Sequence, residues 1–552
     1  MRRLSLPDAA LVLLAATLIV VVLFWRLGTP AFWDPDEAHY AETTQEMSAT
    51  GDWAAPFYNE EPFFDKPVLF HQLQATAMRL VADPEAGARL VPALAALGLV
   101  AITVWFGAVM LSADAAIVAG LMLMACPGLF GLARYAILDT LFTMFIFGGA
   151  ACLAVAALRD RPRLQWAGYV AIALGVQVKG PIALVLCGLT MLMLIACSAD
   201  LRRRLLGLRW ALGLAIIAVV SAPWFLYMYL RFKDGFVNGY VLDENFRLFA
   251  GSRFGNQPGF WFYFQILAAA LLPWTGLLAG RLIDDIRALV RGERLDDVEI
   301  MLWGWSLAVV GFFTLSTFKL DHYIFPAAPA LCLLCARAWS DLRADPASVR
   351  HRASRVGFGL VGPFLLAAGI VLGYLLVARF DLPREALVIP ITMTLAGVAA
   401  IAGFTIRQAQ PPRVPWLVTL VMLVLYAGVI AFVLPALERQ KVVPEMAAWV
   451  ATRAQSTDRV ASFRLNRWTP DYRFYVGRHV ALLEDVNQAD AFFRAPTPFF
   501  CIMRRSAYDE FVARGIPLTI LYEREGTSAT SGRALWRSAS PLVRFVIVSG
   551  TR

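Results

Sequence analysis

Residues 91–111 read VPALAALGLVAITVWFGAVML, a run of 21 positions without a charged side chain. A helix of this length spans roughly 30 Å at about 1.5 Å per residue, which matches the hydrocarbon core of a bilayer. Lipid offers no partner for a free backbone N–H or C=O group, so a stretch of this kind must be helical. The segment therefore predicts a transmembrane helix.

Twelve further apolar stretches continue this pattern over the first 437 residues. The chain of 552 residues is 59% hydrophobic and 16% charged, well below the roughly 25% charged residues of a soluble domain. We therefore predict an α-helical polytopic membrane protein with about 13 transmembrane helices, and no nucleic-acid partner despite the net charge of +9. The twelve stretches lie near 9–24, 115–132, 139–158, 164–178, 182–197, 210–229, 261–280, 300–317, 323–339, 356–377, 386–405 and 416–436.

Arginines in the short connecting loops predict the orientation. The arginine-rich loops are those near 159–163, 202–209, 281–294, 343–355 and 407–413. With thirteen spans, all of these loops fall on the side of the N-terminus, and basic loops are typical of the cytoplasmic side. We expect a protein of the cell inner membrane whose C-terminal region lies on the outer, periplasmic face.

Three segments on that outer face are too long to be simple connectors, and long loops are usually functional: residues 28–88, 230–260 and the tail. In the first, Asp34 at the N-cap and Glu37 three residues later resemble a capping box and predict a helix to about Thr50. A second, amphipathic helix begins at Pro67. We expect Val68, Leu69, Phe70, Leu73 and Leu80 to lie on the membrane, and Gln72, Gln74 and Arg79 to face water.

The tail, residues 438–552, predicts a small α/β domain separate from the transmembrane region of residues 1–437, which includes the outer loop 28–88. It has 17 Lys and Arg against 11 Asp and Glu, a net charge of +6. Such a surface suits anionic membrane lipids, although a merely solvated charged face remains the alternative. Helices are predicted at 444–454, 486–494 and 506–514, and strands at 460–463, 480–483, 499–503, 518–522 and 543–548.

Ionisable residues gather at the outer ends of the predicted spans rather than at mid-membrane, where a transporter would place them. They come from four distant parts of the chain: Asp36, Glu37, His39 and Tyr40; Asp65 and Lys66; Arg134 and Asp139; Lys319, Asp321, His322 and Tyr323. Sugar transfer from a polyprenyl-phosphate lipid needs such groups. A carboxylate accepts the proton of the incoming hydroxyl, and a cation neutralises the departing phosphate. The simple alternatives are an acidic first helical turn for Asp36 and Glu37 and a helix cap for Asp139.

Several motifs resemble the bacterial branch of the protein O-mannosyltransferase superfamily, and within it the 4-amino-4-deoxy-L-arabinose lipid A transferases. The motifs are Asp36-Glu37-Ala38-His39-Tyr40-Ala41-Glu42, Gly51-Asp52-Trp53, Phe64-Asp65-Lys66-Pro67, Leu138-Asp139, Lys179-Gly180-Pro181, and Lys319-Leu320 with Tyr323 and Pro326. The resemblance implies a GT-C fold and an inverting glycosyltransferase that takes its sugar from undecaprenyl phosphate.

The same resemblance implies roles for individual residues. Asp36 is the expected catalytic base, with Glu37 as the alternative, and Asp139 is a second essential carboxylate. Lys66 is expected to contact the lipid phosphate. The further substrate-binding candidates are His39, Tyr40, Arg134, Arg247, Arg253, Lys319 and Tyr323.

The sequence departs from the family pattern at three of these places. The family has Arg at His39, Glu at Asp65, and a Glu-His pair where this chain has Glu244-Asn245. The last two positions are associated with zinc in the aminoarabinose enzymes, whereas Asp65 and Asn245 would suit a harder divalent cation, if any. No cofactor is expected to be required. The leading hypothesis is aminoarabinose transfer to lipid A. A hexose transferase acting on protein or another glycan, and a lipid or sugar transporter, remain the alternatives.

Overall fold

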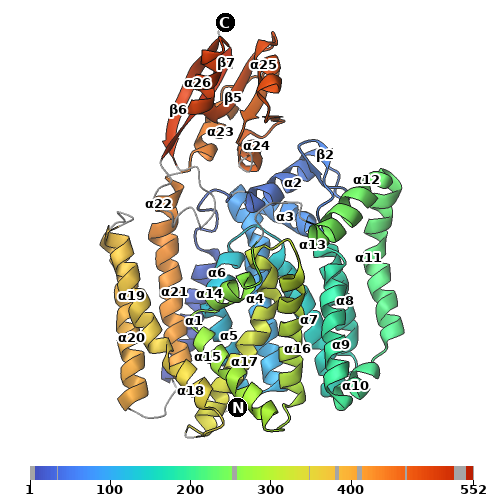
Figure 1. The fold of residues 1–552 in the computed structure, drawn as a ribbon, viewed down its shortest axis with the longest axis vertical. Helices are drawn as coiled ribbons and strands as arrows, with labels where there is room; N and C mark the ends of the chain where they lie inside the picture. Colours follow the sequence, from blue (N-terminus) through green and yellow to red (C-terminus); the bar gives the residue numbers. More distant parts are fainter. Residues whose placement is uncertain are drawn as a thin grey trace. The chain divides into compact units, whose positions relative to one another are not determined.

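The computed structural model describes residues 6–33, 35–251, 258–346, 348–378, 384–406, 413–439, 441–465, 469–526 and 542–550. By contacts, the chain divides into two compact units (Figure 1). The helical unit comprises Met1–Leu27, Phe64–Phe70 and Arg89–Val433, and the sheet unit comprises Gly28–Phe63, His71–Ala88 and Leu434–Arg552. The expected boundary near residue 437 lies close to this division. Most of the outer loop 28–88, however, groups with the tail rather than with the apolar helices.

Every stretch expected to span the membrane is helical. Among the described residues, eight helices are long and apolar enough to cross a membrane, or ten if each of two bent pairs is one span. The other three predicted spans are α1, α8 and α9. The helices are α1 (Leu6–Phe24), α4 (Pro84–Met110), α5 (Ala113–Ala125) with α6 (Pro127–Ala133), α7 (Asp139–Leu158), α8 (Leu164–Lys179), α9 (Ile182–Cys197), α11 (Trp210–Phe232), α14 (Phe262–Ala270) with α15 (Thr275–Val290), α16 (Asp297–Leu315), η2 (Asp321–Ala327) with α17 (Ala328–Ala344), α18 (Arg352–Gly359) with α19 (Val361–Ala378), η3 (Arg384–Leu387) with α20 (Val388–Ile406), and α21 (Val414–Gly428) with η5 (Val429–Val433) and α22 (Leu434–Glu438). The multi-span helical fold is confirmed.

Small residues let α7 and α8 approach each other closely. A Cβ atom at Gly168 of α8 would lie 3.0 Å from the carbonyl oxygen of Gly149 in α7, so a larger residue would push the helices apart. Close packing through small residues is a main source of helix association in membranes. This contact fixes the relative position of the two helices that carry Asp139 and Lys179.

A buried ionic cluster joins α15, α16 and α17. Arg281 is only 3% exposed and pairs with Asp285 at 2.9 Å, with Asp341 at 2.6 Å and with Glu299. The indole N–H of Trp303 donates to Asp285 at 2.8 Å. Because removing one partner would leave a buried charge uncompensated, the cluster holds these three helices in one arrangement.

The tail of the sheet unit is the expected α/β domain. Its sheet has the order β4-β3-β5-β7-β6, with β3 parallel to β4 and β5, and β7 antiparallel to β5 and β6. The strands are β3 (Arg459–Phe463), β4 (Ala481–Leu483), β5 (Phe499–Arg504), β6 (Leu518–Gly526) and β7 (Val543–Gly550), and the helices are α23 (Val443–Ala451), α24 (Thr469–Val476), α25 (Val486–Arg494) and α26 (Arg505–Ala513). All five predicted strands and all three predicted helices are confirmed, and α24 was not predicted.

Alternation along β7 builds the two cores of this domain. Phe545 and Ile547 face the core under α23 and α24, whereas Val546 and Val548 face the core under α25 and α26. Successive side chains of a strand point to opposite faces, so one apolar run supplies both layers. The result is a sheet with helices packed on both faces.

The outer-loop helices are α2 (Asp36–Thr50) and α3 (Leu69–Leu80). Leu73 and Leu80 are exposed as expected, but Val68 and Phe70 are buried, so the prediction that these two lie on the membrane is wrong. The prediction that Gln74 faces water is also wrong. Gln74 is fully buried against α2, where it accepts a hydrogen bond from Thr44 at 2.6 Å and donates to the carbonyl of Ala88 at 3.2 Å. Amphipathicity alone did not reveal that α2 presents a polar face for this side chain to bind.

Helix α2 begins close to where the sequence predicts. The expected N-cap, Asp34, lies outside the described residues. Glu37 is fully buried, and its carboxylate accepts the backbone N–H of Trp33 at 2.9 Å. Glu37 therefore stabilises the start of the helix much as a capping-box glutamate does.

Arg473 of α24 ties α2 to the tail, which explains why the outer loop groups with the sheet unit. Its guanidinium group is 5% exposed and binds Glu46 at 3.0 Å as well as Glu42 and Asn59. One arginine thus faces two buried glutamates. Burial raises the pKa of Glu42 to about 7, although Arg473 acts in the opposite direction.

This cluster predicts a pH-dependent stability. The folded-state pKa of Glu42, about 7, lies above the 4.5 that is usual for a glutamate. The folded state therefore binds more protons than the unfolded state, and the contribution of Glu42 to stability falls as the pH rises from about 4.5 to about 7 and is lost above that. When the pH is lowered from 8 to 6, the free energy of unfolding should increase in the wild type by about 1 kcal/mol more than it does in Glu42→Gln. Thermal unfolding at the two pH values measures the difference, with exposed Glu61→Gln as the matched control. Equal pH responses of wild type and Glu42→Gln would contradict the assignment.

Candidate functional site

A buried ion pair joins the N-terminal end of α7 to the C-terminal end of α8. Asp139 is the first residue of α7 and is 2% exposed. It pairs with Lys179, the last residue of α8. The residue at the N-cap position is Leu138, and it makes no side-chain capping bond. The Asp139 carboxylate therefore binds a cation rather than merely capping its helix, so the simple alternative considered from the sequence is wrong.

His322 and Tyr323 of η2 complete the surroundings of this pair. The Nε2 atom of His322 lies 3.6 Å from Asp139 Oδ2, and its Nδ1 atom lies 3.2 Å from Asp321 Oδ1. The Lys179 ammonium group sits 4.5 Å from the centre of the Tyr323 ring, a cation–π contact. Residues from α7, α8 and η2 that lie far apart in sequence thus meet at one place.

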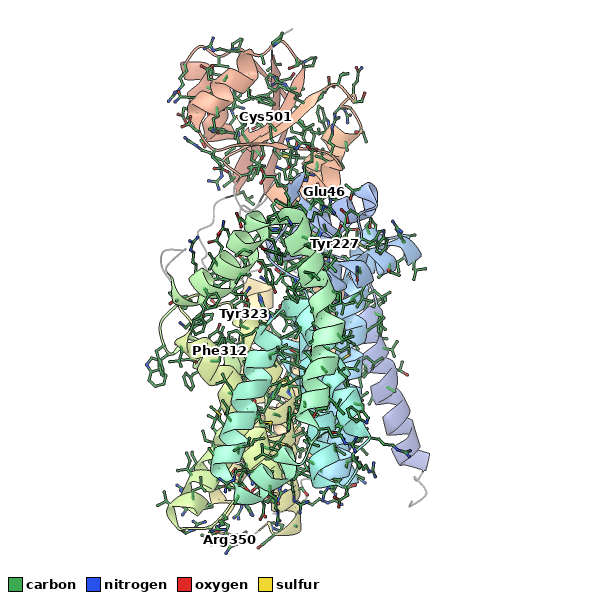
Figure 2. The ribbon with its side chains drawn as sticks, turned by 90° about the vertical axis from the view of Figure 1, so that its right-hand side faces the viewer. Glu46, Tyr227, Phe312, Tyr323, Arg350 and Cys501 are labelled. Atoms are coloured by element: carbon green, nitrogen blue, oxygen red, sulfur yellow. The ribbon has the colours of Figure 1, made fainter. Side chains whose placement is uncertain are left out.

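A cavity of about 90 Å³ opens beside Lys179. Phe312 and Tyr323, two of its lining residues, are labelled in Figure 2. The polar and charged members of the lining are Asp65, Lys66, Lys179, Tyr240, Glu244, Asn245, Ser316 and Tyr323. Two lysines and two acidic residues therefore share a small enclosed space, which is an arrangement suited to an ionic ligand.

Lys66 is held inside this cavity by Glu244. Its ammonium group lies 3.2 Å from the Glu244 carboxylate and donates to the backbone carbonyl of Asp65 at 2.9 Å. Glu244 belongs to the π-helix η1 (Val237–Arg247), and π-helical turns are frequent at functional sites. An incoming anion must therefore compete with Glu244 for Lys66.

Gly180 brings the chain close to Tyr240 at the cavity wall. Its φ of +86° is a conformation that side chains other than glycine rarely adopt, and a Cβ atom there would overlap the Tyr240 hydroxyl. Tyr240 is 2% exposed, and Asn245 Nδ2 donates to its backbone carbonyl at 2.7 Å. The absence of a side chain at Gly180 thus allows the Tyr240 hydroxyl to lie directly against the backbone that follows Lys179.

The candidates of the first outer segment lie in the sheet unit. Asp36 is half-buried at the start of α2, and within the described residues its carboxylate makes no hydrogen bond or ion pair. The His39 ring stacks on Tyr58 at 4.3 Å, and the Tyr40 ring lies 5.7 Å from His71. Of the acidic pair at this helix start, Asp36 is therefore available for chemistry, whereas Glu37 is engaged by the backbone.

His71 is a buried neighbour of these rings that was not expected from the sequence. Burial lowers the pKa of His71 to about 3, and His39 adds to this effect. The Thr44 hydroxyl donates to Gln74, so it accepts from Nδ1–H of the neutral His71 at 2.8 Å. This network fixes α3 against α2.

The remaining candidate cations have other surroundings. Arg134 is buried and donates to the carbonyls of Val22, Leu23 and Arg26 at the end of α1, which gives it a structural role. Arg247 is largely exposed and pairs with Asp243 at 2.5 Å. Lys319 donates to the carbonyl of Ser316, a cavity residue, and partial burial lowers its pKa. Arg253 lies outside the described residues.

The residues suggested for a metal share the cavity without forming a metal cluster. Asp65 and Asn245 both line it, together with Glu244. In the part of the chain that the structure describes, no group of three or more His, Cys, Asp or Glu residues could hold a metal ion. The Lys66 ammonium already supplies positive charge beside Glu244. These donors do not fit a bound divalent cation.

Three of the residues assembled here, Lys179, Glu244 and His322, were given no role from the sequence. His322 was expected only as one of the ionisable residues at the ends of the spans, and Lys179 only as part of a motif. Lys179 and His322 each stand at the end of an apolar stretch, where a charged group is costly unless it is used. Their position was therefore a usable signal. Nothing in the sequence indicated that Glu244 would meet Lys66, because 178 positions separate them.

Comparison with known proteins supports a relationship with lipid-linked sugar transferases. Residues 11–236 match the family described as dolichyl-phosphate-mannose-protein mannosyltransferase. A protein of Aeromonas salmonicida named undecaprenyl phosphate-alpha-4-amino-4-deoxy-L-arabinose arabinosyl transferase is 30% identical over 352 residues, or 62% of each chain. A protein of the same name from Serratia proteamaculans is 27% identical over 65% of each chain. The chain thus matches slightly less than two thirds of the length of these relatives.

Solved structures share the fold. ArnT from Cupriavidus metallidurans, crystallised with undecaprenyl phosphate, has a TM-score of 0.75 and 22% identity over 98% of both chains. The archaeal oligosaccharyltransferase AglB from Archaeoglobus fulgidus, in complex with an inhibitory peptide and a dolichol-phosphate, has a TM-score of 0.52 and 13% identity over 92% of this chain and 68% of its own. The expected GT-C fold and the resemblance to the mannosyltransferase-like family are confirmed.

The close approach at Gly180 predicts a specific loss of stability. Gly180→Ala should destabilise the protein by about 1–3 kcal/mol, because alanine is strained at this φ and its methyl group meets Tyr240. In the double variant with Tyr240→Phe, the stability lost to the clash with the hydroxyl should be recovered, whereas the stability lost to backbone strain should not. Gly188→Ala in α9, where a Cβ atom meets nothing within 4 Å, is the control. Thermal unfolding that gives the two alanine variants equal stability would contradict this account.

Proposed function

We propose that this GT-C protein is an inverting, polyprenyl-phosphate-dependent glycosyltransferase that moves 4-amino-4-deoxy-L-arabinose from undecaprenyl phosphate to lipid A. The observation that carries the proposal is the cavity in which Lys66 and Lys179 lie with their acidic partners. Two lysines at the outer ends of apolar helices suit the phosphate of a lipid whose tail remains in the membrane. The names of the relatives supply the sugar and the polyprenyl carrier.

The proposed mechanism follows from the charges of these residues. Lys66 and Lys179 neutralise the phosphate that departs as the glycosidic bond breaks. Asp139 holds Lys179 in place through the buried ion pair. Asp36 accepts the proton of the attacking acceptor hydroxyl, a contribution of roughly 10²–10⁴ to the rate. Attack on the face of the sugar opposite to the leaving phosphate inverts the anomeric carbon.

The arginine bias of the loops supports an inner-membrane location with the site facing the periplasm. Single cysteines introduced at Asn59 and in the tail should then react with a membrane-impermeant thiol reagent added to intact spheroplasts. A cysteine at Arg203 should react only after the membrane is opened. Labelling of Arg203Cys in intact spheroplasts would reverse the proposed orientation.

An assay with purified components tests the function. The enzyme is supplied with polyprenyl-phospho-aminoarabinose and either lipid A or candidate peptides, and the products are identified by mass spectrometry. We expect aminoarabinose on lipid A, with transfer weakening as ionic strength rises, because an anionic acceptor approaches a basic tail. The departures at His39, Asp65 and Asn245 favour one alternative, a transferase for a neutral hexose. Transfer of such a sugar to a peptide, with lipid A untouched, would establish that alternative.

Asp36→Asn should keep the fold and lose turnover. The amide preserves the shape of the side chain but cannot accept the proton, so activity should fall to below a hundredth of the wild type. Thermal unfolding of the variant, compared with the wild type, controls for structural damage. Activity above about a tenth of the wild type in a stable Asp36→Asn protein would exclude Asp36 as the base.

Lys66 and Glu244 should have opposite effects on donor binding. Lys66→Ala removes a charge-assisted hydrogen bond to phosphate and should weaken binding of polyprenyl phosphate by about 10- to 100-fold, whereas Lys66→Arg should retain most of it. Glu244→Gln should tighten binding, because the phosphate no longer competes with a carboxylate for Lys66. Direct measurements of polyprenyl phosphate binding decide whether Lys66 binds the phosphate or has only a structural role. Unchanged affinity in Lys66→Ala would make the lysine structural.

A further inference from the structure

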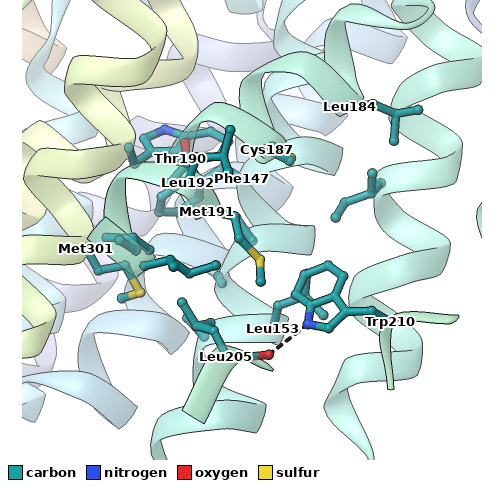
Figure 3. A pocket seen from close by; sticks show the side chains of 18 of the residues that line it. Phe147, Leu153, Leu184, Cys187, Thr190, Met191, Leu192, Leu205, Trp210 and Met301 are labelled. Carbon is teal, nitrogen blue, oxygen red and sulfur yellow. Dashed lines mark hydrogen bonds between the residues drawn. The ribbon is translucent and has the colours of Figure 1, made fainter. Parts of the chain in front are cut away.

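The larger of the two cavities described for the helical unit shares no lining residue with the cavity beside Lys179. It has a volume of about 460 Å³, within the range of roughly 300–1,000 Å³ typical of ligand pockets. Its walls come from α4, α7, α8, α9, α11 and α16 and from α10 (Ala199–Leu206). Figure 3 shows Leu153, Cys187, Met191, Leu205 and Trp210 around it. No charged residue lines this cavity, so it has no part in the proposed chemistry.

Few polar groups line the cavity, and two of them are already hydrogen-bonded within the protein. The Thr190 hydroxyl donates to the carbonyl of Leu186 at 2.8 Å, and the Trp210 indole N–H donates to the carbonyl of Leu205 at 2.8 Å. The polar groups in the wall are thus satisfied within the protein. A cavity of this kind does not hold water, whereas a hydrocarbon chain gains contacts throughout it.

One side of the cavity faces outward from the helices. Leu184, Leu192 and Leu214 are lining residues that are 40%, 65% and 58% exposed. In a membrane-spanning unit, apolar side chains exposed in this way meet lipid. An acyl chain of a lipid in the surrounding bilayer can therefore enter the cavity directly between α9 and α11.

Arginines gather at one end of the same cavity. Leu205 and Trp210 line it, and exposed Arg204 and Arg209 immediately precede them in the sequence. Arg202 is exposed as well, and Arg203 pairs with Asp200 at 3.0 Å. Among the described residues, the guanidinium groups of Arg202, Arg204 and Arg209 have no acidic partner. Uncompensated basic residues beside a gap between transmembrane helices favour an anionic lipid headgroup.

We propose that this cavity binds an anionic phospholipid, with one acyl chain between α9 and α11 and its phosphate at Arg204 and Arg209. The site is separate from the cavity of Lys66 and Lys179. The backbone N–H of Arg209 donates to Gln165, near the first turn of α8, whereas Lys179 is the last residue of that helix. Sixteen residues of helix separate the two ends by about 24 Å. The phosphate bound at the arginines is therefore not that of the donor held at Lys179.

Native mass spectrometry of the full-length protein in detergent tests the proposal. Phosphatidylglycerol is the anionic probe and phosphatidylethanolamine the zwitterionic one. We expect one retained phosphatidylglycerol that is preferred at least several-fold, and that added polyprenyl phosphate does not displace. Equal retention of both phospholipids would overturn the role of the arginines. Displacement by polyprenyl phosphate would instead assign the cavity to the donor tail.

Matched variants test separately the binding of the acyl chain and the binding of the lipid headgroup. Leu214→Trp fills the cavity and should abolish retention, whereas Leu226→Trp on the exposed face of the same helix should not. Arg204→Gln with Arg209→Gln should remove the preference for phosphatidylglycerol, and exposed Arg352→Gln should leave it intact. Retention by Leu214→Trp equal to that of the wild type would overturn the assignment of the cavity.

A measurement on the wild type keeps the test independent of folding. Cys187 lines the cavity, so phosphatidylglycerol should slow its alkylation by a membrane-permeant maleimide several-fold, as mapped by peptide mass spectrometry. Exposed Cys197 of the same helix serves as the internal reference. Equal rates at Cys187 with and without the lipid would also contradict the proposal.

Discussion

A charged side chain at the end of an apolar helix must find a partner, and the pair of Asp139 and Lys179 meets this constraint in the helical unit. Neither residue is stable alone in such surroundings, because an uncompensated buried charge costs several kcal/mol. The pair therefore fixes the ends of α7 and α8 relative to each other. It also places Lys179 beside Tyr323 and at the wall of the cavity that holds Lys66. The requirement that stabilises the fold is thus the same one that brings the cation of Lys179 into one cavity with that of Lys66.

The fold was largely predictable from the sequence because the bilayer imposes length and composition on each span. The strands of the tail were predictable for a similar reason, since Phe545 to Val548 alternate between two cores. Helix α24 was missed because its eight residues are too few to show a helical period. The prediction for Gln74 was wrong because the periodicity of a helix does not show whether its polar face contacts water or the polar side chains of another helix. The meeting of Lys66 with Glu244 depends on tertiary folding and left no local signal.

Two of the three positions that depart from the family pattern that the sequence resembles lie together, whereas the third, His39, lies in the sheet unit. Asp65 and Asn245 face one cavity, beside the Lys66–Glu244 pair. A shorter carboxylate and an amide in place of a histidine both lower the capacity to hold zinc. The ammonium groups of Lys66 and Lys179 supply positive charge in this cavity. In the proposed function, these departures would alter how the donor phosphate and its sugar are held and would leave the carboxylates Asp36 and Asp139 in place.

The central claim is that the protein transfers an aminopentose from a polyprenyl phosphate to lipid A. The most direct measurement is mass spectrometry of lipid A from cells that carry the gene, from cells that lack it, and from the deletion strain complemented in trans. The account predicts a species heavier by one aminopentose in the first and third strains and its absence from the second. Identical lipid A spectra in all three strains, under conditions where the protein is present in the membrane, would contradict it.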